Sequence, residues 1–245
     1  NNVTLGRGGS DFTASIMAST TSASNLDIWT DVSGIYTANP NHVKQSFPIG
    51  QITYKEAMEL SHFGAKVLYP PTVKPVMSKN IPVNIKNTFD PKAKGTIISK
   101  NSKSDSVIKG ISHIEKIALV TIEGSGMVGI PGFSKKLFEE ISNNNINIIM
   151  ITQASSEHSI CIGIKESEAD KAKKIVDEAF KYEIENSILN PCLIENNLSI
   201  IALVGDKMKN HQGISGKMFS SLGKNNINVK AISQGSSERN ITAVI

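Results

Sequence analysis

A glycine-rich turn near the start of the chain has the residue types that bind anions. Residues 5–11 read Leu-Gly-Arg-Gly-Gly-Ser-Asp, and a helix is expected to follow from Phe12 to about Ser22. The glycines allow the backbone to approach a ligand closely, and Ser10 or Asp11 can cap the helix. The N–H groups at such a helix start attract phosphate or carboxylate groups. The turn is not a Walker A loop, because no Gly-Lys-Ser/Thr ends it, and many turns of this kind bind nothing.

Polar side chains also follow a buried strand further along the chain. Leu26–Asp31 is predicted to be a strand with an apolar start and a polar end, formed by Thr30 and Asp31, and Tyr36 lies in the loop after it. In doubly wound α/β sheets, nucleotides bind at the carboxyl ends of the strands. This segment is therefore a candidate nucleotide-binding region.

A capping box predicts where the next helix begins. Thr53 and Glu56 have the spacing of this motif, and the helix is expected over Tyr54–His62. Lys66 follows it, where a lysine is ordinarily a favourable charge at a helix end. A further strand is expected at Ile81–Lys86 and a solvated linker at Ser99–Val107.

The second half of the chain contains an internal repeat. Ile-Thr-Gln-Ala-Ser-Ser-Glu begins at Ile151 and recurs as Ile-Ser-Gln-Gly-Ser-Ser-Glu at Ile232, 81 residues later. The same offset pairs Gly124 with Gly205, Met127 with Met208, Gly132 with Gly213, Phe138 with Phe219, Asn147 with Asn228, and Ile160 with Ile241. A repeat held without a gap over this length indicates two copies of one structural unit.

Each copy predicts the same order of elements. The first strands are expected at Ile117–Ile122 and Ile200–Val204, and the third strands at Ile160–Ile164 and Ile241–Ile245. A helix with apolar residues at near 3.6 spacing lies between them, and in the first copy an amphipathic helix follows at about Glu166–Tyr182. The order β-α-β-β-α is a ferredoxin-like unit without its last strand. Because the second copy stops before its second helix, we expect the chain to be cut at its C-terminus.

The repeated glutamines are candidate ligand contacts. Asn and Ser-Ser-Glu residues are common turn formers and need no further explanation. Gln153 and Gln234 are different, because glutamine is neither a turn former nor a good strand residue, and its amide offers a donor and an acceptor together. We therefore expect these two side chains to contact a small polar ligand.

Composition excludes several classes of function. The formal charge is +4, without a dense Lys/Arg block, so no nucleic-acid or membrane-surface partner is expected. No apolar run approaches the roughly 18 residues of a membrane-spanning helix, and the start has no signal-peptide pattern. Two cysteines without metal spacing fit a reducing, cytoplasmic compartment. The five histidines are scattered, so no metal site is predicted.

Taken together, the motifs resemble aspartokinases. The sequences at 5–11, 28–36 and 56–70 match that family in order and spacing, and the repeat resembles a tandem pair of ACT domains, which sense amino acids. The versions at 151–157 and 234–239 are most similar to the bifunctional aspartokinase–homoserine dehydrogenases. The resemblance implies an α/β fold: the C-terminal part of an amino-acid-kinase three-layer sandwich, followed by tandem ferredoxin-like (βαββαβ) ACT modules. The expected domains are a nucleotide-binding kinase part at 1–100, a linker at 101–112, a first module at 113–190 and a truncated second module at 191–245.

The resemblance also implies a reaction and the residues that perform it. ATP with Mg²⁺ would phosphorylate L-aspartate, and NADP would be a cofactor only if a dehydrogenase domain follows. The implied roles are aspartate binding by Arg7 and Ser10, catalysis by Asp11 and Lys66, and ATP binding by Thr30, Asp31, Tyr36 and Lys66. The implied effector contacts are Gln153, Gln234, Asn147, Asn228, Met127 and Met208, with threonine favoured over lysine as the effector. The ACT modules would also join subunits into a homo-oligomer.

Departures from the family pattern leave a second interpretation open. Asn39-Pro40-Asn41 stands where the family usually has Asp-Pro-Arg, and Tyr69 replaces a frequent histidine. The family's Lys-Phe-Gly-Gly-Thr-Ser motif is expected upstream and is not in this sequence, so the fragment alone is expected to be inactive. The alternative is a non-catalytic amino-acid sensor in which an ACT pair accompanies a degenerate kinase remnant. Another amino-acid kinase is disfavoured by the ACT pair.

Overall fold

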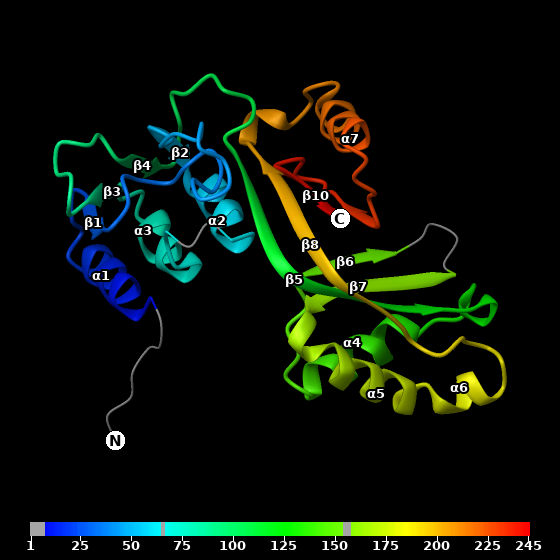
Figure 1. Ribbon diagram of the computed structural model, residues 1–245. Helices are drawn as coiled ribbons and strands as arrows, with labels where there is room; N and C mark the ends of the chain where they lie inside the picture. The colour runs from blue at the N-terminus through cyan, green and yellow to red at the C-terminus, as the bar shows by residue number, and fades with distance from the viewer. Residues whose placement is uncertain (1–7, 65–66, 154–157) are drawn as a thin grey trace. The chain divides into compact units, whose positions relative to one another are not determined.

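The computed structural model describes residues 8–64, 67–153 and 158–245, and they form two compact units (Figure 1). The first unit comprises Asn1–His113, Ile201–Asn226 and Gln234–Thr242. The second comprises Ile114–Ile200, Ile227–Ser233 and Ala243–Ile245. Most of the second repeat copy therefore belongs to the same unit as the kinase-like part. No helix within the described ranges is long and apolar enough to cross a membrane.

A four-stranded sheet is the centre of the kinase-like part. Its order is β1-β3-β4-β2, formed by β1 (Leu26–Thr30), β2 (Gln51–Thr53), β3 (Val83–Asn87) and β4 (Thr96–Ser99). β1 and β3 are parallel, β2 and β4 are parallel, and β3 and β4 are antiparallel. Every second side chain of β1 and β3 is buried, so these side chains share one face of the sheet, and the apolar core forms on that face. The helices of this part are α1 (Gly9–Thr20), α2 (Tyr54–His62), η1 (Pro70–Thr72) and α3 (Val73–Ser78), and α1 packs against α3 (Figure 1).

Most of the predicted elements in this part are confirmed, with shifted boundaries. α2 occupies the predicted residues, and both hydrogen bonds of its capping box are present. α1 starts three residues earlier than predicted, because Gly8 in a left-handed conformation (φ 79°) begins the helix. β3 starts two residues later than predicted. The sequence did not predict β2, α3 or β4, because each has only three to six residues and shows no clear period.

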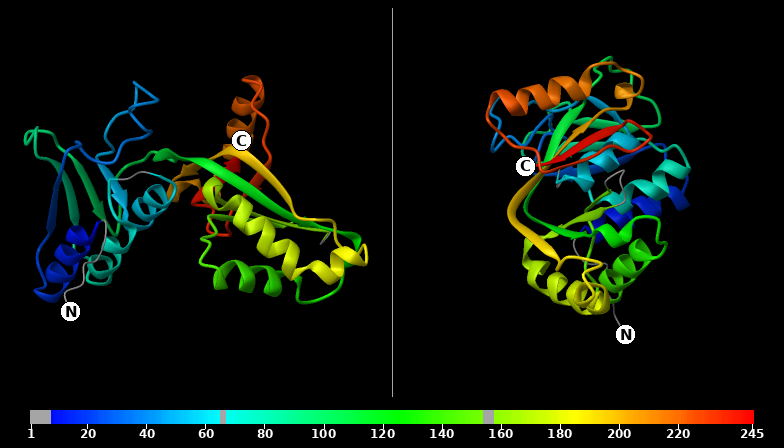
Figure 2. Two further views of the ribbon diagram at one scale, coloured as in Figure 1. Left: turned by 60° about the horizontal axis from the view of Figure 1, so that its bottom comes forward. Right: turned by 90° about the vertical axis from the view of Figure 1, so that its right-hand side faces the viewer.

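The repeat copies contribute a six-stranded sheet in the order β6-β7-β5-β8-β10-β9. The strands are β5 (Gly110–Glu123), β6 (Met150–Gln153), β7 (Ser159–Lys165), β8 (Leu193–Val204), β9 (Ala231–Ser233) and β10 (Asn240–Val244). The first copy carries η2 (Ser125–Met127), α4 (Phe133–Asn143), η3 (Glu166–Glu168), α5 (Ala169–Ala179) and α6 (Lys181–Glu185). The second carries η4 (Asp206–Met208) and α7 (Ile214–Lys224). In the second unit α4 and α5 lie side by side, as Figure 2 shows.

Two predictions about these elements are corrected by the structure. β5 and β8 each begin seven residues before the predicted strand starts, because polar residues in their first halves hid the strand pattern. The single helix predicted at 166–182 is divided into η3, α5 and α6, and the break between α5 and α6 falls at Phe180, whose side chain is buried.

The two copies are equivalent in their backbone contacts as well as in sequence. The N–H of Lys109 donates to the carbonyl of Val204 (2.8 Å), and the N–H of Asn190 donates to the carbonyl of Glu123 (2.9 Å). These bonds correspond through the 81-residue offset. Each copy thus places the end of its first strand against the segment that precedes the first strand of the other copy.

Candidate functional site

The start of α1 is the first part of the predicted kinase site. Gly8 begins the helix, and a Cβ there would lie 2.6 Å from Cβ of Tyr69, so the position accepts only glycine. Among the described residues no side chain caps this helix, so the prediction that Ser10 or Asp11 caps it is wrong; both lie in its first turn. The hydroxyl of Ser10 donates to Oδ1 of Asp11 at 3.4 Å. Arg7, the predicted partner of aspartate, lies outside the described residues.

The end of β1 is the second part. The hydroxyl of Thr30 donates to Oδ1 of Asp31 (3.1 Å), and the carbonyl of Thr30 accepts the N–H of Thr88 (2.8 Å). Asp31 is exposed, and Tyr36 is half-buried where it pairs with Pro48. A short turn joins α1 to β1, and the two elements pack together, so the helix start and the strand end lie at the same edge of this layer. Lys66 lies outside the described residues.

The turn at Asn39–Asn41, where the sequence departs from the family pattern, is held by its own hydrogen bonds. The side chain of Asn39 accepts the N–H of Asn41 (3.0 Å), and the carbonyl of Asn39 accepts the N–H groups of His42 and Val43. Asn41 itself is exposed. A longer side chain at Asn41 would therefore leave these bonds intact.

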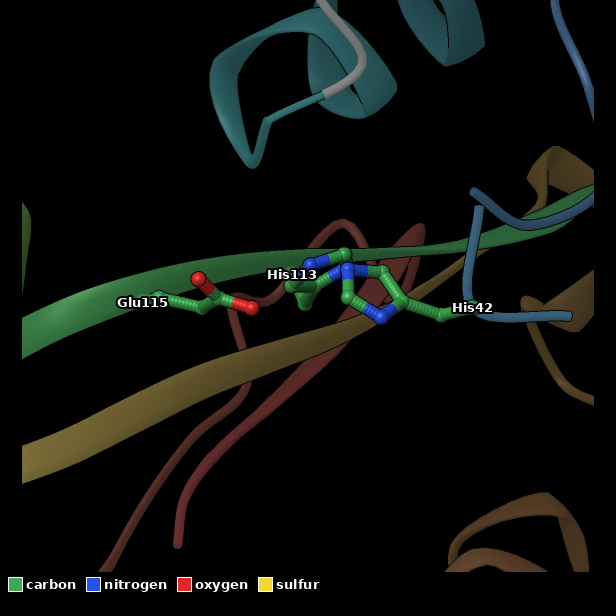
Figure 3. Close-up of side chains that lie close together, drawn as sticks. All are labelled: His42, His113 and Glu115. Atoms are coloured by element: carbon green, nitrogen blue, oxygen red, sulfur yellow. The ribbon is translucent and has the colours of Figure 1, made fainter. Parts of the chain in front are cut away.

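Two of the scattered histidines meet in the first unit. The rings of His42 and His113 pack edge to face with centroids 4.9 Å apart, and Glu115 follows two residues later on the same strand, β5 (Figure 3). Spacing along the sequence did not predict this group, because His42 is 71 residues from His113. The side chains are exposed or half-buried, and exposed groups of this kind are common without a metal.

The second unit contains a pocket in the first repeat copy. Its volume is about 330 Å³. It is lined by Met127, Gly129, Ile130, Pro131, Gly132, Phe133, Ser134, Gln153 and Ile160. Two of the predicted effector contacts, Met127 and Gln153, therefore line one pocket. Met127 is buried, whereas Gln153 is exposed.

The pocket combines apolar walls with polar groups suited to an amino acid. α4 begins at its rim, with Gly132 (φ 113°) as the residue before the helix, and within the described part of the chain no side chain caps that start. The first N–H groups of a helix lack helical partners and favour a negative charge. Gln153 adds a donor and an acceptor, and Met127 and Ile160 supply apolar surface. A carboxylate, an amine and a short side chain match these groups.

The remaining predicted effector contacts lie elsewhere. Asn147 is exposed and is not among the residues that line the pocket. In the second copy Gln234 and Asn228 are exposed, and Met208 is buried in a small core with Leu203, Ile214 and Ile241. The sequence analysis did not predict Ile130–Ser134 as ligand contacts, although they are five of the nine residues that line the pocket. The glycines at 129 and 132 before an amphipathic helix were the available signal.

Comparison with known proteins agrees with this architecture. Residues 1–87 match the amino acid kinase family, and residues 120–180 and 201–245 match the ACT domain. A bifunctional aspartokinase/homoserine dehydrogenase from Haemophilus influenzae is 44% identical over 99% of this chain, which spans 30% of that protein. Aspartate kinase from Clostridium acetobutylicum has a TM-score of 0.86 and 32% identity over 99% of this chain and 55% of its own.

Escherichia coli aspartokinase III has a similar structure. Solved with aspartate and ADP, it has a TM-score of 0.82 and 30% identity over 99% of this chain and 53% of its own. The same protein has also been solved with lysine and aspartate. Like the other two proteins, it is considerably longer than this chain.

The fold and these matches define the class of the protein: a segment of an amino acid kinase joined to paired ACT domains. Within that class the chain is similar to aspartokinases over 99% of its length. Its 44% identity to the bifunctional Haemophilus relative exceeds the 30% identity to aspartokinase III, as the motifs of the repeat predicted.

Proposed function

We propose that the whole protein is an aspartate kinase that transfers the γ-phosphoryl group of ATP to the side-chain carboxylate of L-aspartate. The product would be 4-phospho-L-aspartate, the first intermediate toward threonine, lysine and methionine. The observation that carries this proposal is the junction, in one chain, of a kinase segment and an ACT pocket fitted to an amino acid. The aspartate and ADP bound by aspartokinase III support it.

The site residues fit a mechanism based on positioning and charge. Arg7 and Ser10 would hold the substrate carboxylates, and a bidentate arginine pair is among the stronger charge-assisted contacts. Thr30, Asp31 and Tyr36 would contact ATP at the end of β1. Asp11 and Lys66 would order and neutralise the phosphates during transfer.

Mg²⁺ would accompany the ATP. The hydroxyl of Thr30 and the carboxylates of Asp11 and Asp31 are oxygen ligands of the kind that Mg²⁺ takes in proteins, so the residues present fit this ion. When bound, the ion neutralises charge on the phosphoryl group that is transferred.

We further propose that threonine, rather than lysine, inhibits the kinase by binding the pocket of the first ACT module. The greater identity to the bifunctional relatives supports threonine, and lysine bound by aspartokinase III keeps lysine as the second candidate. The same identity supports a homoserine dehydrogenase domain that uses NADP in the whole protein. The proposed cytoplasmic location rests on the two cysteines without metal spacing, and the proposed homo-oligomer rests on the ACT pair.

The test is an assay of the whole protein, as its gene encodes it. With ATP and Mg²⁺, aspartate should be converted into an acyl phosphate that hydroxylamine traps as a hydroxamate, and glutamate in place of aspartate should give none. Threonine should lower the rate. A folded protein that binds threonine but forms no hydroxamate would instead be the non-catalytic sensor.

A further inference from the structure

The capping box of α2 binds the second ACT module as well as its own helix. The carboxylate of Glu56 is completely buried. Its Oε2 accepts the N–H of Thr53 (2.8 Å), as in any capping box, and its Oε1 accepts the N–H of Asp206 (2.8 Å). Asp206 begins η4, the turn that follows the first strand of the second module. A kinase-part carboxylate thus anchors the backbone of an ACT turn within the first unit.

The side chain of Asp206 binds back to the same helix start. The hydroxyl of Thr53 donates to Oδ2 of Asp206 (2.5 Å), and Nε of Arg239 donates to its Oδ1 (2.5 Å). One turn along α2, Oε2 of Glu59 accepts the side-chain amide of Asn240 (2.6 Å). Two separate segments of the second module, one around Asp206 and one around Arg239 and Asn240, therefore contact the beginning of α2. The two segments are also hydrogen-bonded to each other, through Asp206 and Arg239.

A buried lysine accompanies this group of charges. Lys109 is only 3% exposed, and its backbone N–H donates to the carbonyl of Val204. Burial lowers the pKa of Lys109, and the nearby carboxylates of Glu56, Asp105 and Asp206 oppose that effect. Val204 belongs to the same apolar core as the kinase-part strands. Polar and apolar contacts together make this turn part of the kinase unit.

The residues that form these contacts differ between the two repeat copies, as many other positions of the repeat do. Through the 81-residue offset, Asp206 corresponds to Ser125, Arg239 to His158 and Asn240 to Ser159. Around Asp206, Gly205 and Met208 are the same in both copies. The pocket lining differs too, since Ile130-Pro131 of the first copy is His211-Gln212 in the second. The first copy has the residues of a pocket, and the second has the residues that bind α2.

We propose that Asp206 and Glu56 are positioning residues that transmit the regulation of the kinase, and that the turn of the second ACT module acts as a docking element for α2 rather than as an effector site. This proposal rests on the proposed function. α2 belongs to the kinase part and ends at His62, four residues before Lys66 in the sequence, the lysine that the proposed function assigns to the phosphates. A rearrangement of the ACT pair would displace α2 through these hydrogen bonds, because buried charged groups tolerate little separation from their partners.

The variant that tests the proposal is Asp206→Ser in the whole protein, which introduces the residue of the first copy. Kinase activity without threonine should stay close to that of the wild type, and calorimetry should give an unchanged Kd for threonine. The threonine concentration for half-inhibition should rise about tenfold. Hydrogen exchange of the α2 amides should become faster. Glu56→Gln, which keeps the size of the side chain but removes its charge, should have the same effects, and combining the two changes should add little, because the residues act as a unit.

Asp105→Ser is the matched control. Asp105 pairs with Lys207 of the same turn at 2.8 Å but is almost fully exposed, and no bond to α2 is involved. This variant should behave as the wild type does. Retained inhibition in both Asp206→Ser and Glu56→Gln would overturn the proposal, and so would a loss of threonine binding, since the turn would then be a ligand site. If the wild type has no aspartate kinase activity, the proposed function fails, but unchanged hydrogen exchange of α2 would still separately refute the docking.

Discussion

At the scale of single residues, the equivalent glutamines of the repeat lie in different surroundings. Both are exposed, but Gln153 lines the pocket of the first module, whereas Gln234 belongs to the module that we propose docks on α2. We predict that Gln153→Ala weakens threonine binding two- to tenfold, the loss of about one hydrogen bond. Gln234→Ala should change it much less. Calorimetry on both variants of the whole protein checks this, and equal losses would show two equivalent sites.

Asn41 offers a gain-of-function test at the same scale. It is exposed in a turn that Asn39 holds together, so an arginine there can be accommodated. If the family's arginine faces the phosphates, Asn41→Arg should raise kcat or lower the KM for ATP by restoring a cationic contact. Steady-state kinetics with varied ATP measures both. Asn41→Gln, which adds length without charge, is the control and should change neither constant.

Asp27 links stability to pH. Lys86 and Asn84 hydrogen-bond to its carboxylate and hold its pKa below the usual 3.8. A lowered folded-state pKa contributes stability that is present above the unfolded value and is lost as pH falls through the folded value. The side chains of the Asp27–Lys86 ion pair are about one-third exposed, so Asp27→Asn should lower the free energy of unfolding by less than about 1 kcal/mol at pH 7. Urea unfolding should show this difference constant down to about pH 5 and shrinking below pH 4. A difference that grows on acidification would contradict the assignment.

At the scale of elements, the glycine before each ACT turn is fixed by a close approach of the backbone. A Cβ on Gly205 would lie 2.1 Å from the carbonyl oxygen of Val107, whereas a Cβ on Gly216, within α7, would meet nothing. We predict that Gly205→Ala destabilises the protein by about 1–3 kcal/mol. Gly216→Ala should stabilise it by about 0.5–1 kcal/mol, since alanine is favoured inside a helix. Denaturant unfolding of the two variants compares the same substitution in two surroundings. Equal effects would mean that the close approach carries no cost.

Local signals predicted these elements where the motif itself sets the geometry. The capping box of Thr53 and Glu56 fixed the start of α2, because each partner satisfies a backbone group at the beginning of the helix. Strand ends were predicted less well. The first halves of β5 and β8 have mixed polar patterns, and their strand pairing comes from distant segments. Gly8 shows the same limit, since only contact with Tyr69 reveals why it starts α1.

At the scale of the whole molecule, the repeat predicted two equal modules, but the fold gives them unequal places. The sequence predicted Met127 and Gln153 as effector contacts because both recur at a fixed offset, and both line the pocket of the first copy. It could not predict that Asp206 contacts Glu56, because the two are 150 residues apart and the capping box already explains Glu56 locally. Differences between repeat copies, such as Asp206 against Ser125, were the signal that remained unused.

The identity of the effector is a property of the whole protein, and one measurement decides it. A ligand that binds only the folded state raises stability by an amount set by its concentration relative to Kd, about 2.7 kcal/mol at a hundredfold excess. We predict that threonine raises the thermal unfolding midpoint of the whole protein in a concentration-dependent way, and that lysine and methionine at equal concentration do not. Gln153→Ala should shift the threonine curve to higher concentration, which ties the effect to the first-module pocket. Stabilisation by lysine alone would instead place the protein with the lysine-regulated aspartokinases, and its pocket would then have to accommodate the longer, charged side chain beside Ile130 and Phe133.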